Sequence, residues 1–238
     1  MIEAIDDIAT IDNIATVDNI VTIDNIATID NIVTIDNIAM IDNIAMIDNM
    51  EGRFIMGKKI LVITGSPRAE GNSNTLVSAF ASGAIAAGHE VEIFDAGHAK
   101  MDGCHADKSC EKRGRCGMKD DGQKMGDLMM WADALVLASP LYWKGFTSQI
   151  KIAIDHFYPF SFPKGKETIH IKETGLIATA MMPDESAFDC MVGEYEHINA
   201  VLGWESSFKL LCPGLDGAED VSRHPEYISL AVKYGMEM

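Results

Sequence analysis

The pattern of apolar and polar positions divides the chain near residue 57. From Lys58 onward, short continuous apolar runs alternate with longer segments in which apolar residues recur every three or four positions. The first pattern is typical of buried strands and the second of amphipathic helices. Strands are predicted at residues 60–63, 91–93, 134–138, 175–180 and 207–211, and helices at 74–87, 127–131, 148–157, 184–202 and after Pro225. This alternation predicts a doubly wound α/β domain with a five-stranded parallel sheet.

Residues 1–55 repeat a six-residue unit, IDNIAT with small variations, in which Asp-Asn occurs seven times between Asp12 and Asn49. An aliphatic residue or Met falls at every third position. Three residues turn an α-helix by about 300°, so no apolar stripe forms along one side. The unit resembles the hexapeptide repeat of left-handed parallel β-helices, although so few copies would build only a short stack. The prediction is a low-complexity N-terminal extension that is disordered or lies upstream of the native start, because Met56-Gly57-Lys58 reads as an ordinary beginning.

Charge and composition narrow the classes of partner. The formal net charge is −17, and residues 1–55 contribute −10 of it through nine Asp, two Glu and one Arg. Nucleic acid and anionic membranes are poor partners for such a chain, since either requires a basic face. The apolar runs are far shorter than the roughly 20 residues of a membrane span, and Glu3, Asp6 and Asp7 stand where a secretory signal carries positive charge. Five scattered Cys residues fit a reducing compartment, so a cytoplasmic protein is expected.

A dense run of small polar residues follows the first predicted strand and leads directly into a helix. It contains Gly65, Ser66, Pro67, Arg68, Gly71, Asn72, Ser73, Asn74 and Thr75. Unpaired N–H groups at a helix N-terminus, short hydroxyl side chains and the helix dipole together favour an anion, and Arg68 adds a charged donor. The nucleoside-triphosphate loop requires Gly-Lys-Ser/Thr, and the dinucleotide fingerprint requires three closely spaced glycines. Neither pattern occurs here, so the predicted ligand is a single terminal phosphate.

These residues, together with Pro140-Leu141-Tyr142-Trp143-Lys144-Gly145 after the third strand, resemble the NAD(P)H-dependent FMN reductase family, which includes the iron–sulfur flavoproteins. The resemblance covers residues 57–238 and implies a flavodoxin-like fold with strand order 2-1-3-4-5. It implies that the phosphate of FMN is bound by Ser66, Pro67, Arg68, Asn72, Ser73, Asn74 and Thr75. It also implies that the ring and ribityl chain lie beside Pro140, Leu141, Tyr142, Trp143 and Gly145. In a sheet of that order both motifs flank the gap between the first and third strands, where ligands of such folds bind. Tyr142 and Trp143 offer flat apolar faces, and backbone N–H groups near Gly145 are expected to bond the flavin edge.

Two segments depart from the family pattern. Relatives often carry Gly-Gly in the loop after the fourth strand, where this chain has Met181-Met182, which changes the third flavin-contacting loop. Cys104, Cys110 and Cys116 stand in the place of the four-cysteine cluster motif of iron–sulfur flavoproteins, but their wide spacing offers no close pair and no fourth ligand. We assign no metal ligand there. Neighbouring Lys and Arg residues predict a surface loop whose cations lower a thiol pKa or attract the phosphates of a nicotinamide cofactor.

The resemblance implies an FMN-dependent oxidoreductase in which NAD(P)H delivers hydride to the flavin and the flavin reduces a small-molecule acceptor, such as a flavin or a quinone. No proton-transfer residue is assigned, because the cofactor carries the chemistry. Relatives are commonly homodimers or homotetramers, and the same is expected here. One alternative is a flavodoxin-like or iron–sulfur-flavoprotein-like electron-transfer protein without its own nicotinamide reaction. Another is a flavin-free interaction protein in which the repeat segment is the working part.

Overall fold

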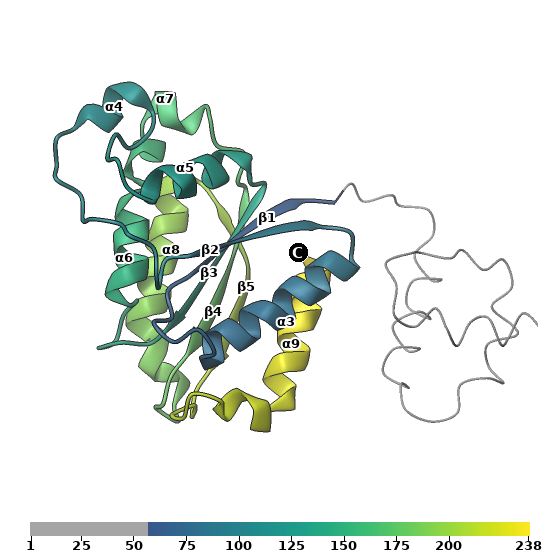
Figure 1. Cartoon of the computed structure of the whole chain (residues 1–238). Helices are drawn as coiled ribbons and strands as arrows, with labels where there is room; N and C mark the ends of the chain where they lie inside the picture. The colour runs from purple at the N-terminus through teal and green to yellow at the C-terminus, as the bar shows by residue number, and fades with distance from the viewer. Residues whose placement is uncertain (1–56) are drawn as a thin grey trace, which may run out of the picture. The chain divides into compact units, whose positions relative to one another are not determined.

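The sheet at the centre of the molecule is entirely parallel (Figure 1). A computed structural model describes residues 57–238, and the predicted tail at residues 1–55 lies outside the described residues. The strands are β1 (Lys59–Thr64), β2 (Glu90–Asp95), β3 (Ala134–Pro140), β4 (Glu173–Thr179) and β5 (Glu205–Cys212). They lie in the order β2-β1-β3-β4-β5, which confirms the predicted order.

Helices cover both faces of this sheet. One face carries α3 (Asn72–Ala86) and α9 (Pro225–Glu237), and the other carries α5 (Gly122–Trp131), α6 (Ser148–Asp155) and α8 (Asp189–Leu202) (Figure 1). The short helices α4 (Ser109–Arg113) and α7 (Pro163–Lys166) contact each other at the upper end of Figure 1. Single 3₁₀ turns are formed by η2 (Tyr158–Ser161), η3 (Glu185–Phe188) and η4 (Asp220–Arg223). Among residues 57–238, no helix is long and apolar enough to cross a membrane.

Strand β1 shows how the sequence builds two cores. Successive side chains of a strand point to opposite faces of the sheet. Ile60 and Val62 therefore join the core under α3 and α9, whereas Leu61 and Ile63 join the core under α5, α6 and α8. All four side chains are fully buried. A strand covered on both faces consequently reads as a continuous apolar run.

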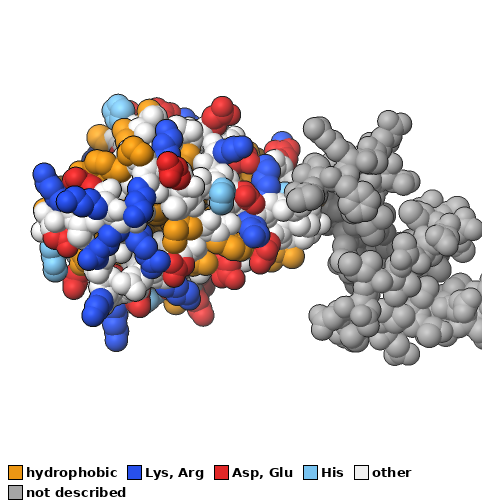
Figure 2. All heavy atoms as spheres, turned by 90° about the horizontal axis from the view of Figure 1, so that it is seen from above, with side chains coloured by type: hydrophobic (Ala, Val, Ile, Leu, Met, Phe, Trp, Pro, Cys, Tyr) orange, Lys and Arg blue, Asp and Glu red, His pale blue; other side chains and the backbone are white. Residues whose placement is uncertain are grey.

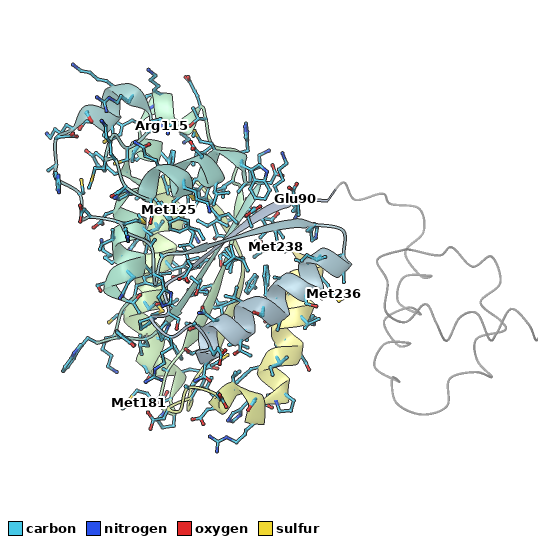
Figure 3. The ribbon with its side chains drawn as sticks, in the orientation of Figure 1. Glu90, Arg115, Met125, Met181, Met236 and Met238 are labelled. Carbon is cyan, nitrogen blue, oxygen red and sulfur yellow. The ribbon has the colours of Figure 1, made fainter. Side chains whose placement is uncertain are left out.

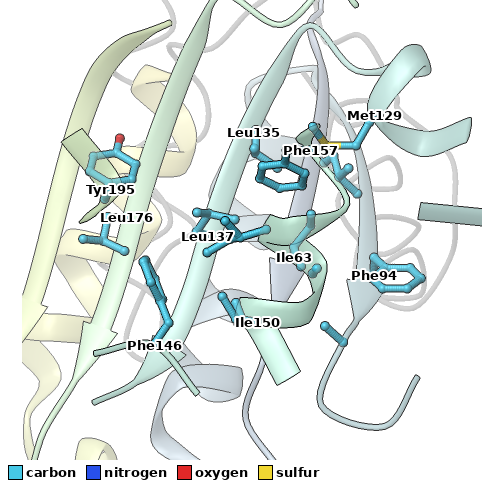
Figure 4. Close-up of a cluster of buried hydrophobic side chains, with 14 of the residues drawn as sticks. Ile63, Phe94, Met129, Leu135, Leu137, Phe146, Ile150, Phe157, Leu176 and Tyr195 are labelled. Atoms are coloured by element: carbon cyan, nitrogen blue, oxygen red, sulfur yellow. The ribbon is translucent and has the colours of Figure 1, made fainter. Parts of the chain in front are cut away.

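Each core fixes the helices that cover it. In the larger one, Leu135 and Leu137 of β3 pack with Ile150 of α6 (Figure 4). On the other face, the ring centroids of Phe80 and Phe208 lie 5.5 Å apart and those of Phe208 and Tyr234 lie 4.7 Å apart. These stacked rings join α3, β5 and α9, so aromatic packing holds α3 in position.

The helix boundaries differ from prediction at their N-terminal ends. α3 begins at Asn72 rather than residue 74, and α5 begins at Gly122 rather than residue 127. The Asp184 carboxylate accepts the Ser186 N–H at 2.9 Å and so caps η3, after which α8 begins at Asp189. A first helical turn made of small and polar residues carries no apolar period, so hydrophobic periodicity detects these helices late.

Cys212 ends β5 and is fully buried, and burial raises the pKa of its thiol to about 12. Cys104 and Cys190 are exposed. At about pH 8.5, iodoacetamide is therefore expected to alkylate Cys104 and Cys190 in the folded chain and Cys212 only after denaturation, because the thiolate is the reactive form. Peptide mass spectrometry would show this difference, and equal modification of Cys212 and Cys190 would contradict it.

The same pKa makes Cys212 a source of alkaline instability. In the unfolded chain the thiol ionises near its ordinary pKa of 9.0, whereas in the folded chain it stays protonated up to about pH 12. As the pH rises, the Cys212 thiol therefore loses its proton first in the unfolded chain. The contribution of Cys212 to the free energy of unfolding decreases between about pH 9 and pH 12.

Candidate functional site

The two predicted motifs meet at the edge of the sheet where the parallel strands end. A cavity of about 200 Å³ opens there, and we call it the strand-end cavity. It is lined by Ser66, Pro67, Arg68, Gly71, Asn72, Ser73, Pro140, Leu141, Tyr142, Thr179, Ala180, Met181, Leu215 and Asp216. The lining comes from the loops after β1, β3, β4 and β5, and β1 and β3 flank the point where the chain reverses its strand order. Ligands of open α/β sheets bind at this place.

Most of the predicted binding residues line the strand-end cavity. These are Ser66, Pro67, Arg68, Asn72, Ser73, Pro140, Leu141 and Tyr142. Four others lie outside its lining: Asn74, Thr75, Trp143 and Gly145. These four residues lie outside the lining because of hydrogen bonds within the β1–α3 segment and within the loop after β3.

The N-terminus of α3 is open toward a ligand. Its N-cap residue is Gly71, no side chain caps it, and its first turn contains no acid. Within residues 57–238, the N–H groups of Asn72, Ser73 and Asn74 have no acceptor, and the Thr75 N–H is the first to pair, with Gly71 O at 3.0 Å. Three donors without acceptors among the described residues, at the positive end of a 15-residue helix, make this terminus a candidate anion site.

Two side chains add to this anion site. Ser73 is almost completely buried, lines the strand-end cavity, and its hydroxyl has no hydrogen-bond partner among the described residues. Arg68 also lines the cavity, and its guanidinium forms no ion pair within the described part of the chain. A hydroxyl and a cation are thus available to an anion beside the helix terminus.

The loop between β1 and α3 is held in shape by its own side chains. The Ser66 hydroxyl accepts the Arg68 N–H at 3.2 Å and donates to Arg68 O at 2.9 Å. Asn74 Nδ2 donates to Arg68 O and Ala69 O, both at 3.0 Å, while its Oδ1 accepts the Thr64 hydroxyl. The Asn74 side chain therefore shapes the loop instead of facing the cavity.

The Asn72 side chain also forms hydrogen bonds within the protein. Its Nδ2 donates to Gly217 O at 2.7 Å, and its Oδ1 accepts the Val221 N–H at 3.0 Å. These bonds tie the start of α3 to the loop after β5, which brings Asp216 to the strand-end cavity. Asn72 therefore offers a ligand its backbone N–H and fixes a neighbouring loop with its side chain.

The loop after β3 folds into a tight turn. The Tyr142 N–H donates to Gly145 O and the Gly145 N–H donates to Tyr142 O, each at 3.0 Å. Trp143 and Lys144 between them have φ values of 47° and 69°, which is the left-handed region used by type I′ turns. Backbone N–H groups near Gly145 were expected to bond the flavin edge, and the Gly145 N–H itself is paired within the turn. The Trp143 side chain is fully exposed outside the cavity lining.

The bases of these loops are joined by buried polar contacts. The Leu141 N–H donates to Thr179 O at 2.7 Å, and the buried Thr147 hydroxyl donates to Gly65 O at 2.9 Å. A Cβ added at Gly65 would lie 2.1 Å from Cγ1 of Ile150. Gly65 is therefore required by the close approach of α6.

The loops after β4 and β5 complete the cavity, and Thr179, Ala180, Leu215 and Asp216 were not among the predicted site residues. The two loops pair with each other, because Leu215 N–H donates to Ala180 O and Gly214 N–H donates to Met182 O, both at 2.8 Å. Met181 lines the cavity at the lower edge of the molecule in Figure 3. The predicted strand order could have identified these residues. Parallel strands end at one edge of the sheet, so every loop that leaves this edge is a candidate part of a ligand site.

The cysteine segment forms a separate feature. Cys104, Cys110 and Cys116 line another cavity, of about 450 Å³, beside Tyr158. Burial, reinforced by the other two thiols, raises the pKa of Cys110, so the expected lowering by cations is wrong for this residue. Within residues 57–238, no three His, Cys, Asp or Glu side chains are placed to hold a metal ion.

The cations of this segment lie away from the strand-end cavity. Arg115 and Met181 mark opposite ends of the molecule in Figure 3. Figure 2 looks onto the end that carries α4 and α7, where Lys and Arg side chains gather. These cations therefore lie at the end of the molecule away from the strand-end cavity, and their attraction for the phosphates of a nicotinamide cofactor stays a prediction.

Comparison with known proteins supplies independent information. The sequence model of the family described as NADPH-dependent FMN reductase matches residues 58–187. An iron-sulfur flavoprotein of Methanocaldococcus jannaschii is 32% identical over 101 residues, which are 42% of this chain and 52% of that protein. This chain spans about half the length of the curated relatives it matches.

Two solved structures share the fold. The NAD(P)H:quinone oxidoreductase from Methanothermobacter marburgensis superimposes with a TM-score of 0.60 at 19% identity, covering 76% of this chain and 96% of that one. An azoreductase from Bacillus anthracis gives 0.58 at 15% identity, covering 76% of this chain and 100% of that one. At such identities the likeness establishes the flavodoxin-like fold alone.

Proposed function

Because this chain belongs to the NADPH-dependent FMN reductase family, we propose that it binds FMN in the strand-end cavity and passes hydride from NAD(P)H through that flavin to a small-molecule acceptor. The observation that carries this proposal is the open N-terminus of α3. Among the described residues, the backbone N–H groups of the first helical turn, the Ser73 hydroxyl and the Arg68 guanidinium have no partner, and Asn72, Ser73 and Arg68 line the cavity. This donor set suits a terminal phosphate.

The protein residues hold and orient the cofactor. Asn72, Ser73 and Asn74 would donate their backbone N–H groups to the phosphate, and Ser73 and Arg68 would add side-chain donors. Leu141 and Tyr142 line the same cavity from the β3 loop and offer apolar surface to the rest of the molecule. Since the loops are tied by hydrogen bonds before any ligand binds, little ordering cost is added on binding.

FMN, when bound, supplies the two-electron chemistry between NAD(P)H and the acceptor. In the overall reaction, NAD(P)H and one proton from solvent are consumed while the acceptor gains two electrons and two protons. The protein is required to position both reactants and to admit them in turn. We accordingly propose no proton-transfer residue.

The small-molecule acceptor distinguishes this proposal from an electron-transfer protein. Solved structures with the same fold include a quinone oxidoreductase and an azoreductase, whereas the matching curated relatives are iron-sulfur flavoproteins. The described cysteines offer no convergent metal-ligand set. We therefore favour the enzyme over a cluster-dependent electron carrier.

The test uses the full chain and absorbance. Purified protein is expected to be yellow, or to become so with added FMN, and the released cofactor should be identified as FMN by chromatography. NADPH or NADH added without oxygen should then bleach the bound flavin at a rate sufficient for turnover. A chain that takes up no FMN would overturn the proposal. Flavin that is bleached quickly by a protein reductant and not by either nicotinamide would establish the electron carrier instead.

A further inference from the structure

A second cavity lies at the opposite edge of the sheet, where the parallel strands begin. It measures about 560 Å³, and we call it the strand-start cavity. Its lining comes from residues just before β1, β3, β4 and β5 and from helix α7. The seven residues of β4 separate the two edges by roughly 20 Å. The strand-start cavity is therefore distinct from the strand-end cavity, and its volume is typical of a small-molecule site.

Trp204 presents an unpaired donor to the strand-start cavity. The residue is only 7% exposed, and its indole N–H has no hydrogen-bond partner among the described residues. In residues 57–238, the side-chain polar atoms that are sealed from solvent without a partner are Nδ1 of His156 and Nδ2 of Asn199. The Trp204 N–H is not one of them, so it reaches the surface, and Trp204 lines this cavity. Buried tryptophans usually pair this group, so an acceptor on a ligand would complete it.

The turn after α8 holds Trp204 in place. Gly203 has a φ of 75°, and Asn199 O accepts the N–H groups of Gly203 at 2.8 Å and of Trp204 at 2.9 Å. The rings of Phe157 and Trp204 meet edge to face, with their centroids 6.1 Å apart. The indole is thus fixed before any ligand binds, which lowers the cost of ordering it.

The segment before β4 has further donors left for a ligand. Ile169, His170 and Ile171 all line the strand-start cavity, and none of their backbone N–H groups has an acceptor among the described residues. Pairing resumes at Lys172, whose N–H donates to Asp133 O at 3.2 Å. Backbone N–H groups are obligatory donors, so solvent or a ligand must accept from these three.

The acids that line the strand-start cavity already have partners. Asp133 Oδ2 accepts the Lys59 N–H at 3.0 Å. Glu173 pairs with Lys58, and its Oε2 accepts the Ser207 hydroxyl at 2.9 Å. These carboxylates are therefore not available to bind a cation in the cavity.

The lysines of the lining are left with one positive charge in excess. Lys58, Lys166 and Lys172 line the cavity against two acids, and Lys166 and Lys172 form no ion pair within residues 57–238. Lys166 belongs to α7, and Figure 2 looks onto the end of the molecule that carries α7, where Lys and Arg side chains gather. The cavity consequently favours an anion of low charge.

The rest of the lining is apolar. Phe160, Ile171 and Trp204 are almost completely buried, and Ile169 and Leu202 are half-buried beside them. Apolar walls with a few polar donors are typical of sites for organic molecules. An inorganic anion would leave these walls uncovered.

We propose that the strand-start cavity binds a small organic monocarboxylate. Its carboxylate accepts the Trp204 N–H and is attracted by Lys166 and Lys172, while its apolar body covers Phe160 and Ile171. A single negative charge matches the excess of one cation, whereas a phosphate monoester carries about −1.5 to −2 near pH 7. This site does not depend on the proposed flavin site.

The experiment measures the binding of 1-naphthoate to the full chain by isothermal titration calorimetry with FMN in excess. One 1-naphthoate is expected per chain, with a Kd of about 100 μM. Uncharged 1-naphthamide and doubly charged 1-naphthyl phosphate should each bind at least about tenfold more weakly. The same result is expected if the chain takes up no FMN, so failure of the proposed function leaves this test intact.

Two variants test the donors. Lys172→Gln removes a cation from an exposed side chain, and Trp204→Phe removes the N–H but keeps an aromatic ring. Each should weaken 1-naphthoate binding by about 5- to 10-fold, and Lys172→Gln should change the affinity for 1-naphthamide by less than about twofold. Lys124→Gln is the matched control, because Lys124 is exposed on α5 outside the cavity lining, and it should match the wild type.

Nuclear magnetic resonance locates the ligand directly. The chain has three tryptophans, Trp131, Trp143 and Trp204, and of these Trp204 lines the strand-start cavity. In a ¹H–¹⁵N spectrum, 1-naphthoate should shift the indole resonance that is missing from Trp204→Phe and leave the other two in place. If Trp204→Phe does not fold, Lys172→Gln and its control still decide the matter.

Four outcomes would overturn the proposal. Competition between FMN and 1-naphthoate would place the carboxylate in the strand-end cavity. Equal affinity for all three naphthyl compounds would mean that apolar surface alone binds them, and tighter binding of 1-naphthyl phosphate would exclude the monocarboxylate class. Unchanged affinity in Lys172→Gln and in a folded Trp204→Phe would mean that 1-naphthoate binds elsewhere.

Discussion

Replacing Ser73 by Asp is expected to weaken FMN binding by about 100-fold or more, equivalent to roughly 2.7 kcal/mol. Ser73 is almost completely buried at the open start of α3 and lines the strand-end cavity, and its hydroxyl has no partner among the described residues. A carboxylate at this position would bind the free N–H groups of its own helix and repel a phosphate from the same donors.

Titration of FMN and riboflavin into the cofactor-free chain would check this prediction. Riboflavin lacks the phosphate, so its affinity should change by less than about threefold, and the preference for FMN should largely vanish. Ser78→Asp is the matched control, because Ser78 is exposed on the same helix, away from the cavity lining. If Ser73→Asp lowers the affinities for FMN and riboflavin equally, the phosphate does not lie at the start of α3.

The sequence predicts where an anion site lies more reliably than it predicts which side chains of the loop face that site. A strand followed by small polar residues and a helix predicts an anion site because backbone groups form it, whatever the side chains do. The side chains of Asn72 and Asn74 have the composition of ligands, yet they bond to the loop at Gly217 and to Arg68 O. Such partners lie far away along the chain or depend on the path of a turn. Composition alone cannot reveal them.

The same limit applies to the second motif. Aromatic residues after β3 were predicted to lie beside the flavin, and Tyr142 lines the strand-end cavity. Only the folded turn shows that the Trp143 side chain is fully exposed and that the Gly145 N–H is paired with Tyr142 O. The contribution of Leu215 and Asp216 required the folded arrangement of β5 next to β4, although the predicted strand order already placed those loops at one edge.

The position of α3 depends on a backbone contact that periodicity does not show. A Cβ at Gly83 would lie 2.1 Å from Val232 O of α9, and a Cβ at Gly235 would lie 2.1 Å from Phe80 O of α3. The two helices therefore meet through glycines, closely enough to exclude a methyl group. Because α3 also supplies the donors of the proposed phosphate site, we expect this crossing to hold that site as well as the core.

Gly83→Ala is accordingly expected to lower the free energy of unfolding by about 2–3 kcal/mol, since the new methyl group forces α3 and α9 apart in a packed core. Gly193→Ala is the matched control: Gly193 lies inside α8, and nothing lies within 4 Å of a Cβ there. That change should raise the free energy of unfolding by about 0.5–1 kcal/mol through helix propensity. Urea denaturation followed by circular dichroism would measure both variants. Equal effects of the two substitutions would mean that α3 and α9 do not meet through their backbones. A destabilised Gly83→Ala chain that still bound FMN with wild-type affinity would show that the phosphate site does not depend on this crossing.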